Sequence, residues 1–234
     1  MTSYSYVGSE LDVFSHASNW KAYYKSLIQS YLEEEVLEVG AGIGATTKSL
    51  CDGQQHRWIC LEPDPALATK IKPMIDSGEL PKCCEVRVGT LSDLSPTETF
   101  NVILYIDVLE HIENDRAEVI QAAKHLKDGG VLIVLSPAHQ WLFTPFDKAI
   151  GHFRRYNKRS LSALIPSDLT CVKLIYLDSV GSLVSSGNRL ILKSDMPTSR
   201  QITFWDKIMI PLSQRLDPVL QYSVGKSILG IWRR

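Results

Sequence analysis

The feature that most constrains this chain is a glycine-rich run placed directly after a short apolar run. Residues 36–39 are Val-Leu-Glu-Val, and residues 40–44 are Gly-Ala-Gly-Ile-Gly. Glycines at alternate positions let the backbone turn tightly after a strand and come close to a ligand, where a Cβ would clash. The pattern predicts a strand, a ligand-binding loop and a helix. It does not name the ligand, because residues 40–45 also satisfy the permissive GxGxxA form of the dinucleotide-binding fingerprint.

The rest of the chain repeats this alternation of short apolar runs and longer helical patterns. Such alternation is typical of βαβ units that form a mainly parallel sheet with helices on both faces. The predicted strands cover residues 36–39, 57–61, 85–88, 100–106, 131–135, 171–177 and 227–232. The predicted helices cover residues 17–33, a segment ending near 50, and residues 65–75, 114–126, 161–164 and 202–221. Asn114 is a predicted N-cap, and residues 127–130 (Lys-Asp-Gly-Gly) are predicted to form a turn.

Two acidic residues narrow the choice of ligand. Glu38 lies at the end of the first predicted strand, where its carboxylate would repel a pyrophosphate and would suit a cationic ligand. Glu62 follows the second predicted strand, where a carboxylate accepts hydrogen bonds from both hydroxyls of a ribose. A carboxylate that binds ribose occurs in dinucleotide sites and in sites for a cationic nucleoside cofactor alike. Glu38 is therefore the residue that favours the cationic ligand over the dinucleotide.

At these positions the sequence resembles the class I S-adenosylmethionine-dependent methyltransferases, over roughly residues 17–178. The matching motifs are the first motif at residues 36–44, the ribose motif at 61–64, the adenine loop at 89–93, the segment after the fourth strand at 107–112, and the GG turn with the fifth strand at 126–135. The resemblance implies a doubly wound, Rossmann-like sheet of seven strands, one of them antiparallel. It also implies that S-adenosylmethionine is the cofactor and binds at the carboxyl ends of the strands.

The resemblance further implies a cofactor-binding role for one group of residues. These are Glu38, Gly40, Gly42 and Gly44 at the methionine moiety, Glu62 and Pro63 at the ribose, Thr90 and Leu91 beside the adenine, and Asp107 with Val108 near the ammonium or sulfonium end. The family often has an acid after the glycine of the adenine loop, whereas this chain has Thr90. Adenine recognition is therefore left to backbone amides and Asp93.

The acceptor side is expected in residues 137–159, which are rich in aromatic and basic residues and fit neither a helical nor a strand period. Such a segment in a compact domain is typical of a functional loop. Its GHxRRY element, residues 151–156, looks like one found in a subgroup of small-molecule methyltransferases. His139 is a candidate general base or hydrogen-bond donor. Arg154 and Arg155 suit a carboxylate or phosphate, or else brace the loop.

Tyrosines supply the other candidates. Tyr176 lies near the end of the sixth predicted strand, where its hydroxyl can orient a substrate and its ring can stabilise a sulfonium. His139, Tyr176 and Asp107 form the predicted catalytic set. Tyr4 and Tyr6, ahead of the first helix, are candidates for a lid over the cofactor.

Residues 107–112 also contain a DxxEH pattern formed by Asp107, Glu110 and His111. Carboxylates and imidazole suit magnesium or zinc. The first acid has the short arm of aspartate, and Glu110 and His111 equally suit a position in solvent or at a helix cap. No metal is therefore assigned to this chain.

The composition excludes several classes of protein. The formal net charge is −1, and because nucleic-acid binders usually carry a basic excess, no nucleic-acid partner is expected. The longest apolar run covers residues 131–135, far short of the roughly 20 residues that cross a membrane, so no membrane partner is expected. The five cysteines include no CxxC, which indicates free thiols. With no signal-peptide pattern at the first residues, a cytoplasmic location is expected.

We therefore expect one S-adenosylmethionine-binding domain over residues 1–234. Residues 1–33 are expected to form an N-terminal helix and lid, and residues 137–159 and 181–222 to face the substrate. Trp205 and Trp232 are expected in the core or at an oligomer contact. The oligomeric state is left open.

The leading functional hypothesis is an S-adenosylmethionine-dependent methyltransferase that acts on a small molecule. The alternative is a cyclase, in which the amine of S-adenosylmethionine attacks its own aminocarboxypropyl arm and gives azetidine-2-carboxylate and methylthioadenosine. Bending that arm is a role for Asp107, His139, Tyr176 and Thr203. A second alternative is a non-catalytic subunit that binds the cofactor.

Overall fold

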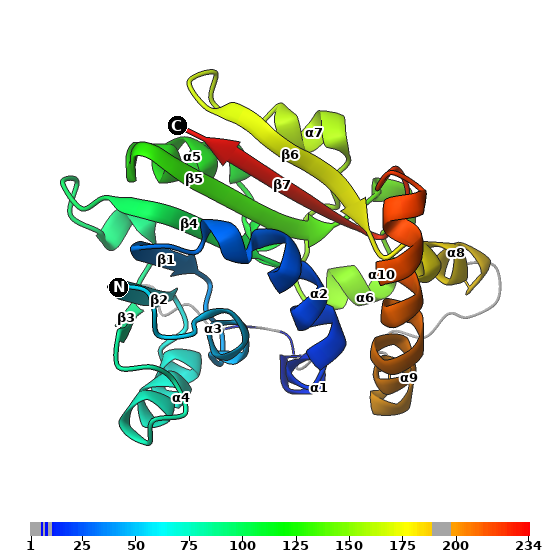
Figure 1. Cartoon of the computed structure of the whole chain (residues 1–234), viewed down its shortest axis with the longest axis horizontal. Helices are drawn as coiled ribbons and strands as arrows, with labels where there is room; N and C mark the ends of the chain where they lie inside the picture. Colours follow the sequence, from blue (N-terminus) through cyan, green and yellow to red (C-terminus); the bar gives the residue numbers. More distant parts are fainter. Residues whose placement is uncertain (1–5, 7, 9–10, 189–197) are drawn as a thin grey trace.

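The computed structural model describes residues 6, 8, 11–188 and 198–234. Its centre is a seven-stranded sheet with the strand order β3-β2-β1-β4-β5-β7-β6 (Figure 1). The strands are β1 (Glu35–Val39), β2 (Arg57–Glu62), β3 (Cys84–Val88), β4 (Phe100–Ile106), β5 (Leu126–Pro137), β6 (Thr170–Leu177) and β7 (Ser227–Arg233). All the predicted strands are present, and the largest difference is that β5 begins at Leu126 rather than at residue 131.

The strands run parallel except β7, which is antiparallel to both of its neighbours, β5 and β6. This confirms the doubly wound, Rossmann-like class with one antiparallel strand. The central strands are covered on both faces, and the side chains of residues 102–105 in β4 are at most 1% exposed. Strands that are buried on both faces form continuous apolar runs, which is why residues 100–106 and 131–135 show no polar alternation.

Helices pack on both faces of the sheet (Figure 1). One face carries α2 (Ser18–Ile28), α3 (Ala45–Leu50), α4 (Pro65–Asp76) and α10 (Ile210–Val219), whose apolar side chains join one core. The other face carries α5 (Asp115–Lys124) and α7 (Lys158–Ser162) around a second core. The predicted N-cap of α5 is confirmed, because the Asn114 side-chain oxygen accepts a hydrogen bond from the Ala117 amide at 3.3 Å.

Four further helices border the cavity described below. They are α1 (Leu11–Ser15), α6 (Pro145–Ala149), α8 (Ser179–Asn188) and α9 (Ser199–Phe204). The helix predicted over residues 202–221 is divided into α9, a π-helical turn (Trp205–Met209) and α10. Such turns often occur at functional sites, and this one brings Trp205 and Met209 to the cavity wall.

The turn predicted at residues 127–130 is wrong, because these residues form a bulge inside β5. Phe100 pairs with Leu126 and Val102 pairs with Val131, so four residues of β5 lie opposite one residue of β4. A Cβ on Gly130 would lie 2.9 Å from the Lys127 carbonyl oxygen. Glycine therefore lets the extra residues fit without ending the strand.

The C-terminal helical segment is fastened to the start of α2 by one buried carboxylate. Asp206 accepts hydrogen bonds from the Asn19 amide at 3.2 Å, the Asn19 side-chain amide at 3.1 Å and the Trp20 amide at 2.9 Å. The N-cap residue of α2 is Ala17, whose side chain offers no acceptor. Asp206 thus satisfies backbone donors that the helix itself leaves unpaired, and fixes two cavity walls to each other.

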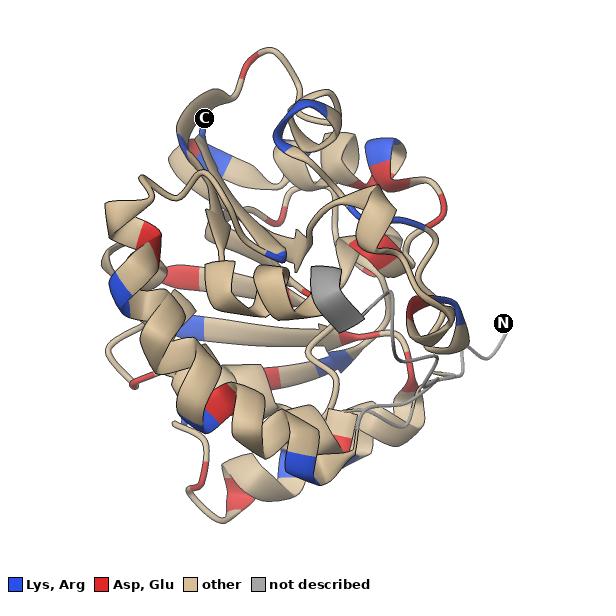
Figure 2. Cartoon of the chain, turned by 90° about the vertical axis from the view of Figure 1, so that its right-hand side faces the viewer, with Lys and Arg blue, Asp and Glu red and all other residues tan. Residues whose placement is uncertain are grey.

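Charged residues of both signs are interspersed over the side of the molecule shown in Figure 2. This mixture agrees with the formal net charge of −1. Within the residues that the structure describes, no helix is long and apolar enough to cross a membrane.

Candidate active site

A cavity of about 770 Å³ opens at the carboxyl ends of β1, β4 and β5. Three predicted site residues, Gly40, Gly42 and Asp107, are among the described residues that line it. Its walls come from α1, α2, α6, α8 and α9, and from the π-helical turn. The segments expected to form the lid and the substrate side, residues 1–33, 137–159 and 181–222, therefore all contribute residues to the wall of this cavity.

The glycine loop, residues 40–44, packs against the side chain of Val108. Gly40, Gly42 and Gly44 have φ angles of 69°, 58° and 80°, in the left-handed region that favours glycine. A Cβ on Gly40 would lie 2.6 Å from Cγ2 of Val108, so no larger residue fits at that position. Val108 therefore supports the loop from behind, and Gly44 is the N-cap residue of α3. Neither of these two lines the cavity.

Glu62 holds the glycine loop against the end of β2. Its Oε2 accepts a hydrogen bond from the Gly42 amide at 2.7 Å, and its Oε1 accepts one from the Asp64 amide at 2.9 Å. Burial raises the pKa of this carboxyl, an effect that the two amides oppose. Pro63 is half-buried beside it. The predicted ribose acceptor is thus fixed in place while each of its oxygens keeps a second lone pair.

The N-terminal segment reaches the same part of the molecule. The Tyr6 amide donates a hydrogen bond to Oδ2 of Asp64 at 2.8 Å, and the Tyr6 ring lies 5.7 Å from the ring of His111. Tyr6 lines the cavity, where a lid residue is expected. Tyr4 lies outside the described residues.

Glu38 lies beneath the loop, which differs from the expected contact with the donor. Its Oε2 accepts hydrogen bonds from the Thr47 hydroxyl at 2.6 Å and from the Trp58 indole at 2.8 Å. Burial raises the pKa of Glu38 to about 7, although these two donors lower it. The carboxyl group therefore ties β1 to α3 and β2, and does not line the cavity.

The predicted adenine loop is closed by its own hydrogen bonds. Asp93 accepts hydrogen bonds from the Thr90 amide at 2.8 Å and the Thr90 hydroxyl at 3.0 Å, which hold the pKa of Asp93 below its usual value. The carboxylate is thus engaged in a capping box. Leu91 is buried and Thr90 is exposed, and neither lines the cavity.

Asp107 ends β4 in the left-handed region, with φ of 54°, and its amide donates a hydrogen bond to the Leu135 carbonyl at 2.8 Å. Its side chain is exposed to the cavity. The surrounding protein atoms raise the pKa of Asp107 to about 6, and the neighbouring His152, Lys21 and Lys226 oppose that rise. A carboxylate at this point suits a positively charged ligand group.

His139 and Tyr176 lie against each other outside the cavity. Their ring centroids are 4.6 Å apart, and the Tyr176 hydroxyl accepts a hydrogen bond from the Lys158 amide at 3.1 Å. Neither is among the described residues that line the cavity, so the structure does not assemble the predicted catalytic set. The reason is the strand order: β7 separates β6 from β5, which moves Tyr176 away from the glycine loop.

The arginines of the GHxRRY element brace the loop. Arg155 forms a two-pronged contact with Asp147, with its Nε 2.8 Å and its Nη2 2.9 Å from the two carboxylate oxygens. Arg154 pairs with Asp115, which also accepts a hydrogen bond from the Tyr156 hydroxyl at 2.8 Å. Both guanidinium groups are thus paired with carboxylates of the protein. This agrees with the alternative in which Arg154 and Arg155 brace the loop and do not bind a ligand.

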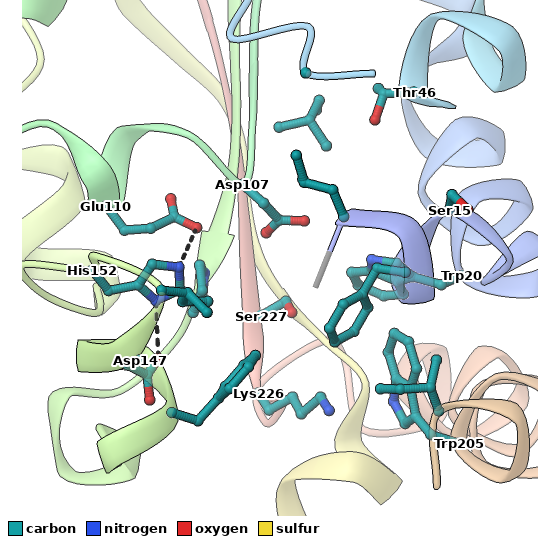
Figure 3. Close-up of a pocket in the computed structure, with 18 of the residues that line it drawn as sticks. Ser15, Trp20, Thr46, Asp107, Glu110, Asp147, His152, Trp205, Lys226 and Ser227 are labelled. Atoms are coloured by element: carbon teal, nitrogen blue, oxygen red, sulfur yellow. Dashed lines mark hydrogen bonds and ion pairs between the residues drawn. The ribbon is translucent and has the colours of Figure 1, made fainter. Parts of the chain in front are cut away.

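A polar cluster of Glu110, His111 and His152 lies at one side of the cavity (Figure 3). The first two residues belong to the 3-10 turn after β4, and His152 follows α6. Nδ1 of His152 lies 3.0 Å from Oδ1 of Asp147, and its Nε2 lies 3.8 Å from Oε1 of Glu110. The DxxEH pattern flagged Glu110 and His111, but no local signal shows that His152 joins them.

Opposite this cluster, the cavity has an aromatic wall that the sequence did not reveal. Trp20 and Trp205 lie with their ring centroids 5.8 Å apart (Figure 3). Nζ of Lys226 lies 4.5 Å from the centroid of the Trp205 ring. Trp20 lies within the helix predicted over residues 17–33, and Trp205 was expected in the core or at an oligomer contact. The hydrogen bonds to Asp206 and the contacts of the Trp205 ring with Phe14 and Trp20 bring these distant segments together.

Comparison with known protein families identifies the family of this chain. A protein family described as "Methyltransferase domain" matches residues 16–168, a range that contains the glycine loop, Glu62 and Asp107. The chain belongs to this family. Methyltransferases of this fold use S-adenosylmethionine, as the motif resemblance implied, and solved neighbours are complexes with its product, S-adenosylhomocysteine.

Two curated methyltransferases match part of the chain. The demethylmenaquinone methyltransferase of Tropheryma whipplei (strain Twist) is 27% identical over 165 residues, which cover 66% of this chain and 62% of the relative. The ubiquinone biosynthesis O-methyltransferase of Rhodopseudomonas palustris (strain HaA2) is 26% identical over 111 residues, 45% of this chain and 41% of the relative. The chain thus spans less than two thirds of the length of these relatives.

Among solved structures, a coclaurine N-methyltransferase bound to N-methylheliamine and S-adenosylhomocysteine has a TM-score of 0.63 at 14% identity. The match covers 92% of this chain and 72% of that methyltransferase, and it shows a shared fold.

The residues at the cavity fit the cofactor of this methyltransferase family. The side-chain-free positions Gly40 and Gly42 expose backbone to the cavity, and Gly42 is held there by Glu62. Asp107 offers a negative charge to the same space, which suits the ammonium or sulfonium of the donor. These residues would hold its methionine moiety, with Glu62 at the ribose.

Proposed function

We propose that this chain transfers the methyl group of S-adenosylmethionine to a hydroxyl group of a small, ring-containing molecule. The observation that carries the proposal is that one cavity joins the glycine loop to an aromatic wall and a polar cluster. Its volume of about 770 Å³ lies within the range of roughly 300–1,000 Å³ that is common for small-molecule sites.

The residues divide the work of the transfer between binding, alignment and exclusion of water. When bound, S-adenosylmethionine supplies a methyl group on a positively charged sulfur, and the acceptor displaces it in one step. Asp107 would orient the charged end of the donor toward the acceptor. Trp20 and Trp205 exclude water from the space between the two molecules. The polar cluster of Glu110, His111 and His152 would contact the acceptor hydroxyl and its proton.

The acceptor class follows from the wall of the cavity. Phe14, Trp20, Phe204 and Trp205 all line it, and the rings of Phe14 and Trp205 make an edge contact at 6.0 Å. Aromatic walls favour flat, apolar ligands. The two curated relatives are named for demethylmenaquinone and for ubiquinone biosynthesis, so a quinol-like ring is the acceptor that we would test first. The three segments at residues 1–33, 137–159 and 181–222 would then be the lid and substrate side of one domain.

No finding supports the cyclase alternative. Of the residues suggested for bending the aminocarboxypropyl arm, only Asp107 lines the cavity. The hydroxyl of Thr203 donates a hydrogen bond to the Ser199 carbonyl at 2.8 Å, within its own helix. The same product assay separates the two reactions, because cyclisation releases methylthioadenosine without any acceptor.

The proposal is tested by mass spectrometry of reactions with S-adenosylmethionine, with and without a panel of hydroquinones and catechols. We expect S-adenosylhomocysteine and a singly methylated acceptor only when a phenolic acceptor is present. Calorimetry adds a binding test, in which Asp107→Ala weakens cofactor binding at least several-fold. Tyr176→Phe, outside the cavity, is the matched control and leaves binding unchanged. Methylthioadenosine from the cofactor alone, or cofactor binding without any transfer, would refute the proposal.

A further inference from the structure

Glu110 is a buried carboxyl group at one side of the cavity, with the Ser136 hydroxyl and the Arg155 guanidinium among its neighbours. Its side chain is 0% exposed, and neither carboxylate oxygen accepts a hydrogen bond from any described residue. The nearest imidazole atom, Nε2 of His152, lies 3.8 Å from Oε1, which is outside hydrogen-bonding distance. The neighbouring guanidinium of Arg155 is already paired with Asp147. Buried carboxylates are normally hydrogen-bonded, paired with a cation or bound to a metal, so Glu110 lacks a partner.

Donor atoms of the right kind surround Glu110. One carboxylate oxygen of Glu110 and one ring nitrogen each of His111 and His152 all lie within 4.8 Å of one another. Zinc binds nitrogen and oxygen at about 2.0–2.2 Å in a tetrahedral arrangement, so two of its ligand atoms lie about 3.4 Å apart. The 3.8 Å between Glu110 and His152 is longer than this by less than about 0.5 Å. The remaining separations close with shifts of less than about 1 Å.

His152 is held in the orientation that a metal ligand needs. Its Nδ1 lies 3.0 Å from Oδ1 of Asp147. Asp147 also accepts hydrogen bonds from Thr144 and Arg155, and it has no proton to give. Nδ1 therefore carries the hydrogen and donates it to Asp147, which leaves the lone pair of Nε2 facing Glu110. A carboxylate behind a ligating histidine is a common arrangement in metal sites, where it fixes the ring and its tautomer.

The second imidazole is also ready to act as a ligand. The rings of His111 and His152 meet edge to face with centroids 4.5 Å apart. Both rings line the cavity beside Glu110, so one ring nitrogen of each is available to the same ion.

We propose that Glu110, His111 and His152 bind a divalent transition-metal ion at the acceptor side of the cavity. Two imidazoles and one carboxylate suit zinc or another first-row ion better than magnesium, which prefers oxygen ligands throughout. All three residues line the cavity, so the remaining coordination positions face the space for the acceptor. From the sequence alone no metal was assigned, because Asp107 has a short arm and Glu110 and His111 also suited solvent or a helix cap. The structure adds His152 to Glu110 and His111 as a third ligand.

The ion's role in catalysis rests on the proposed function. A metal-bound phenol loses its proton to solvent more readily, and the resulting oxygen attacks the methyl carbon. The new O–C bond forms as the C–S bond breaks, and the electron pair of that bond stays on sulfur, giving S-adenosylhomocysteine. No further reactant is needed.

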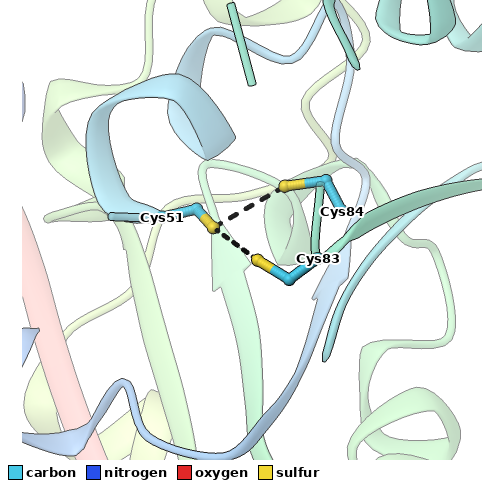
Figure 4. A group of neighbouring side chains, drawn as sticks. All are labelled: Cys51, Cys83 and Cys84. Atoms are coloured by element: carbon cyan, nitrogen blue, oxygen red, sulfur yellow. Dashed lines mark hydrogen bonds between the residues drawn. The ribbon is translucent and has the colours of Figure 1, made fainter. Parts of the chain in front are cut away.

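A second cluster must be separated from this one in any zinc experiment. The thiol of Cys51 lies 3.6 Å from those of Cys83 and Cys84 (Figure 4). These three cysteines are free, and their sulfur atoms also form a group able to hold a metal. They lie away from the cavity, so Cys51→Ser is a control that removes one thiol and leaves the polar cluster intact.

The test is calorimetric titration of zinc into the full chain after removal of metals with EDTA. We expect Glu110→Gln and His152→Asn each to weaken one zinc site at least tenfold, and Cys51→Ser to leave that site unchanged. Asp147→Asn should weaken it by roughly 10–100-fold, because the residue behind the ligand orients it. Circular dichroism confirms that each variant is folded, and a zinc-dependent rise in the melting temperature of the wild type, lost in Glu110→Gln, gives a second readout.

Equal zinc affinity in folded Glu110→Gln, His152→Asn and wild-type protein would overturn the proposed site. So would a wild type whose zinc binding disappears entirely in Cys51→Ser. These measurements use no cofactor, so they stand apart from the methyl-transfer assay. If the site binds zinc and metal-free protein transfers methyl groups at the same rate as the zinc-loaded protein, the proposed catalytic role is refuted.

Discussion

Glu38 gives the fold a pH-dependent stability that a single substitution should remove. Its carboxyl group is 2% exposed and accepts hydrogen bonds from Thr47 and Trp58. The change to test is Glu38→Gln, which keeps an oxygen acceptor of nearly the same shape and removes the titrating proton. Because Glu38 does not line the cavity, its effect on stability is separable from cofactor contact.

The raised pKa of Glu38 determines how its contribution to the free energy of unfolding changes with pH. Burial raises the pKa of Glu38 from 4.5 to about 7 in the native state. Between these values the native protein holds a proton that the unfolded chain has released, so the free energy of unfolding falls as pH rises. This contribution is fully present below pH 4.5 and is lost as the pH passes through about 7. At about 1.4 kcal/mol per pKa unit, the loss over the window is on the order of 3 kcal/mol.

The assay is urea denaturation of wild type and Glu38→Gln at a series of pH values from 4.5 to 8. The difference in unfolding free energy, wild type minus variant, should fall by about 3 kcal/mol across the series. Glu79→Gln, a substitution at an exposed glutamate, controls for the loss of one negative charge. Parallel pH profiles for wild type and Glu38→Gln would refute the reasoning, since they would mean that Glu38 is ionised in the native protein.

Three further substitutions test the structure around the site. Gly40→Ala places a side chain at φ of 69° and 2.6 Å from Val108, so we expect a loss of at least about 1–2 kcal/mol in urea denaturation and weaker cofactor binding by calorimetry. Adding Val108→Ala should restore part of that stability. Asp206→Ala removes the acceptor at the start of α2 and should cost about 1–3 kcal/mol by the same method. Tyr156→Phe leaves Asp115 paired with an arginine and should cost only about 1 kcal/mol, with cofactor affinity unchanged.

A different outcome would contradict each of these three predictions. A Gly40→Ala variant that is no better in combination with Val108→Ala would mean that the side-chain contact is unimportant. Full stability after Asp206→Ala would show that another group caps α2. A loss of cofactor affinity in Tyr156→Phe would place that loop closer to the donor than the structure does.

Much of the fold was predictable because the relevant signals are local. A buried strand requires an apolar run and a tight loop requires glycine, so the strand pattern and the loop at residues 40–44 followed from the sequence. The position of Asp107 was predictable in the same way, because it directly follows the buried run of β4. The exception is the turn predicted at residues 127–130, where the local glycine signal marks a bulge inside β5.

The tertiary structure decided which distant residues meet. The insertion of β7 between β5 and β6 moves Tyr176 away from the glycine loop, and no local pattern encodes that strand order. The direction of the Glu38 side chain depends on donors from α3 and β2. His152 joins Glu110 only through the folding of residues 137–159 over the sheet. The sequence by itself determined a cofactor-binding sheet with a glycine loop, whereas long-range packing decided the composition of the acceptor side, because contacts between distant segments depend on register and burial rather than on spacing along the chain.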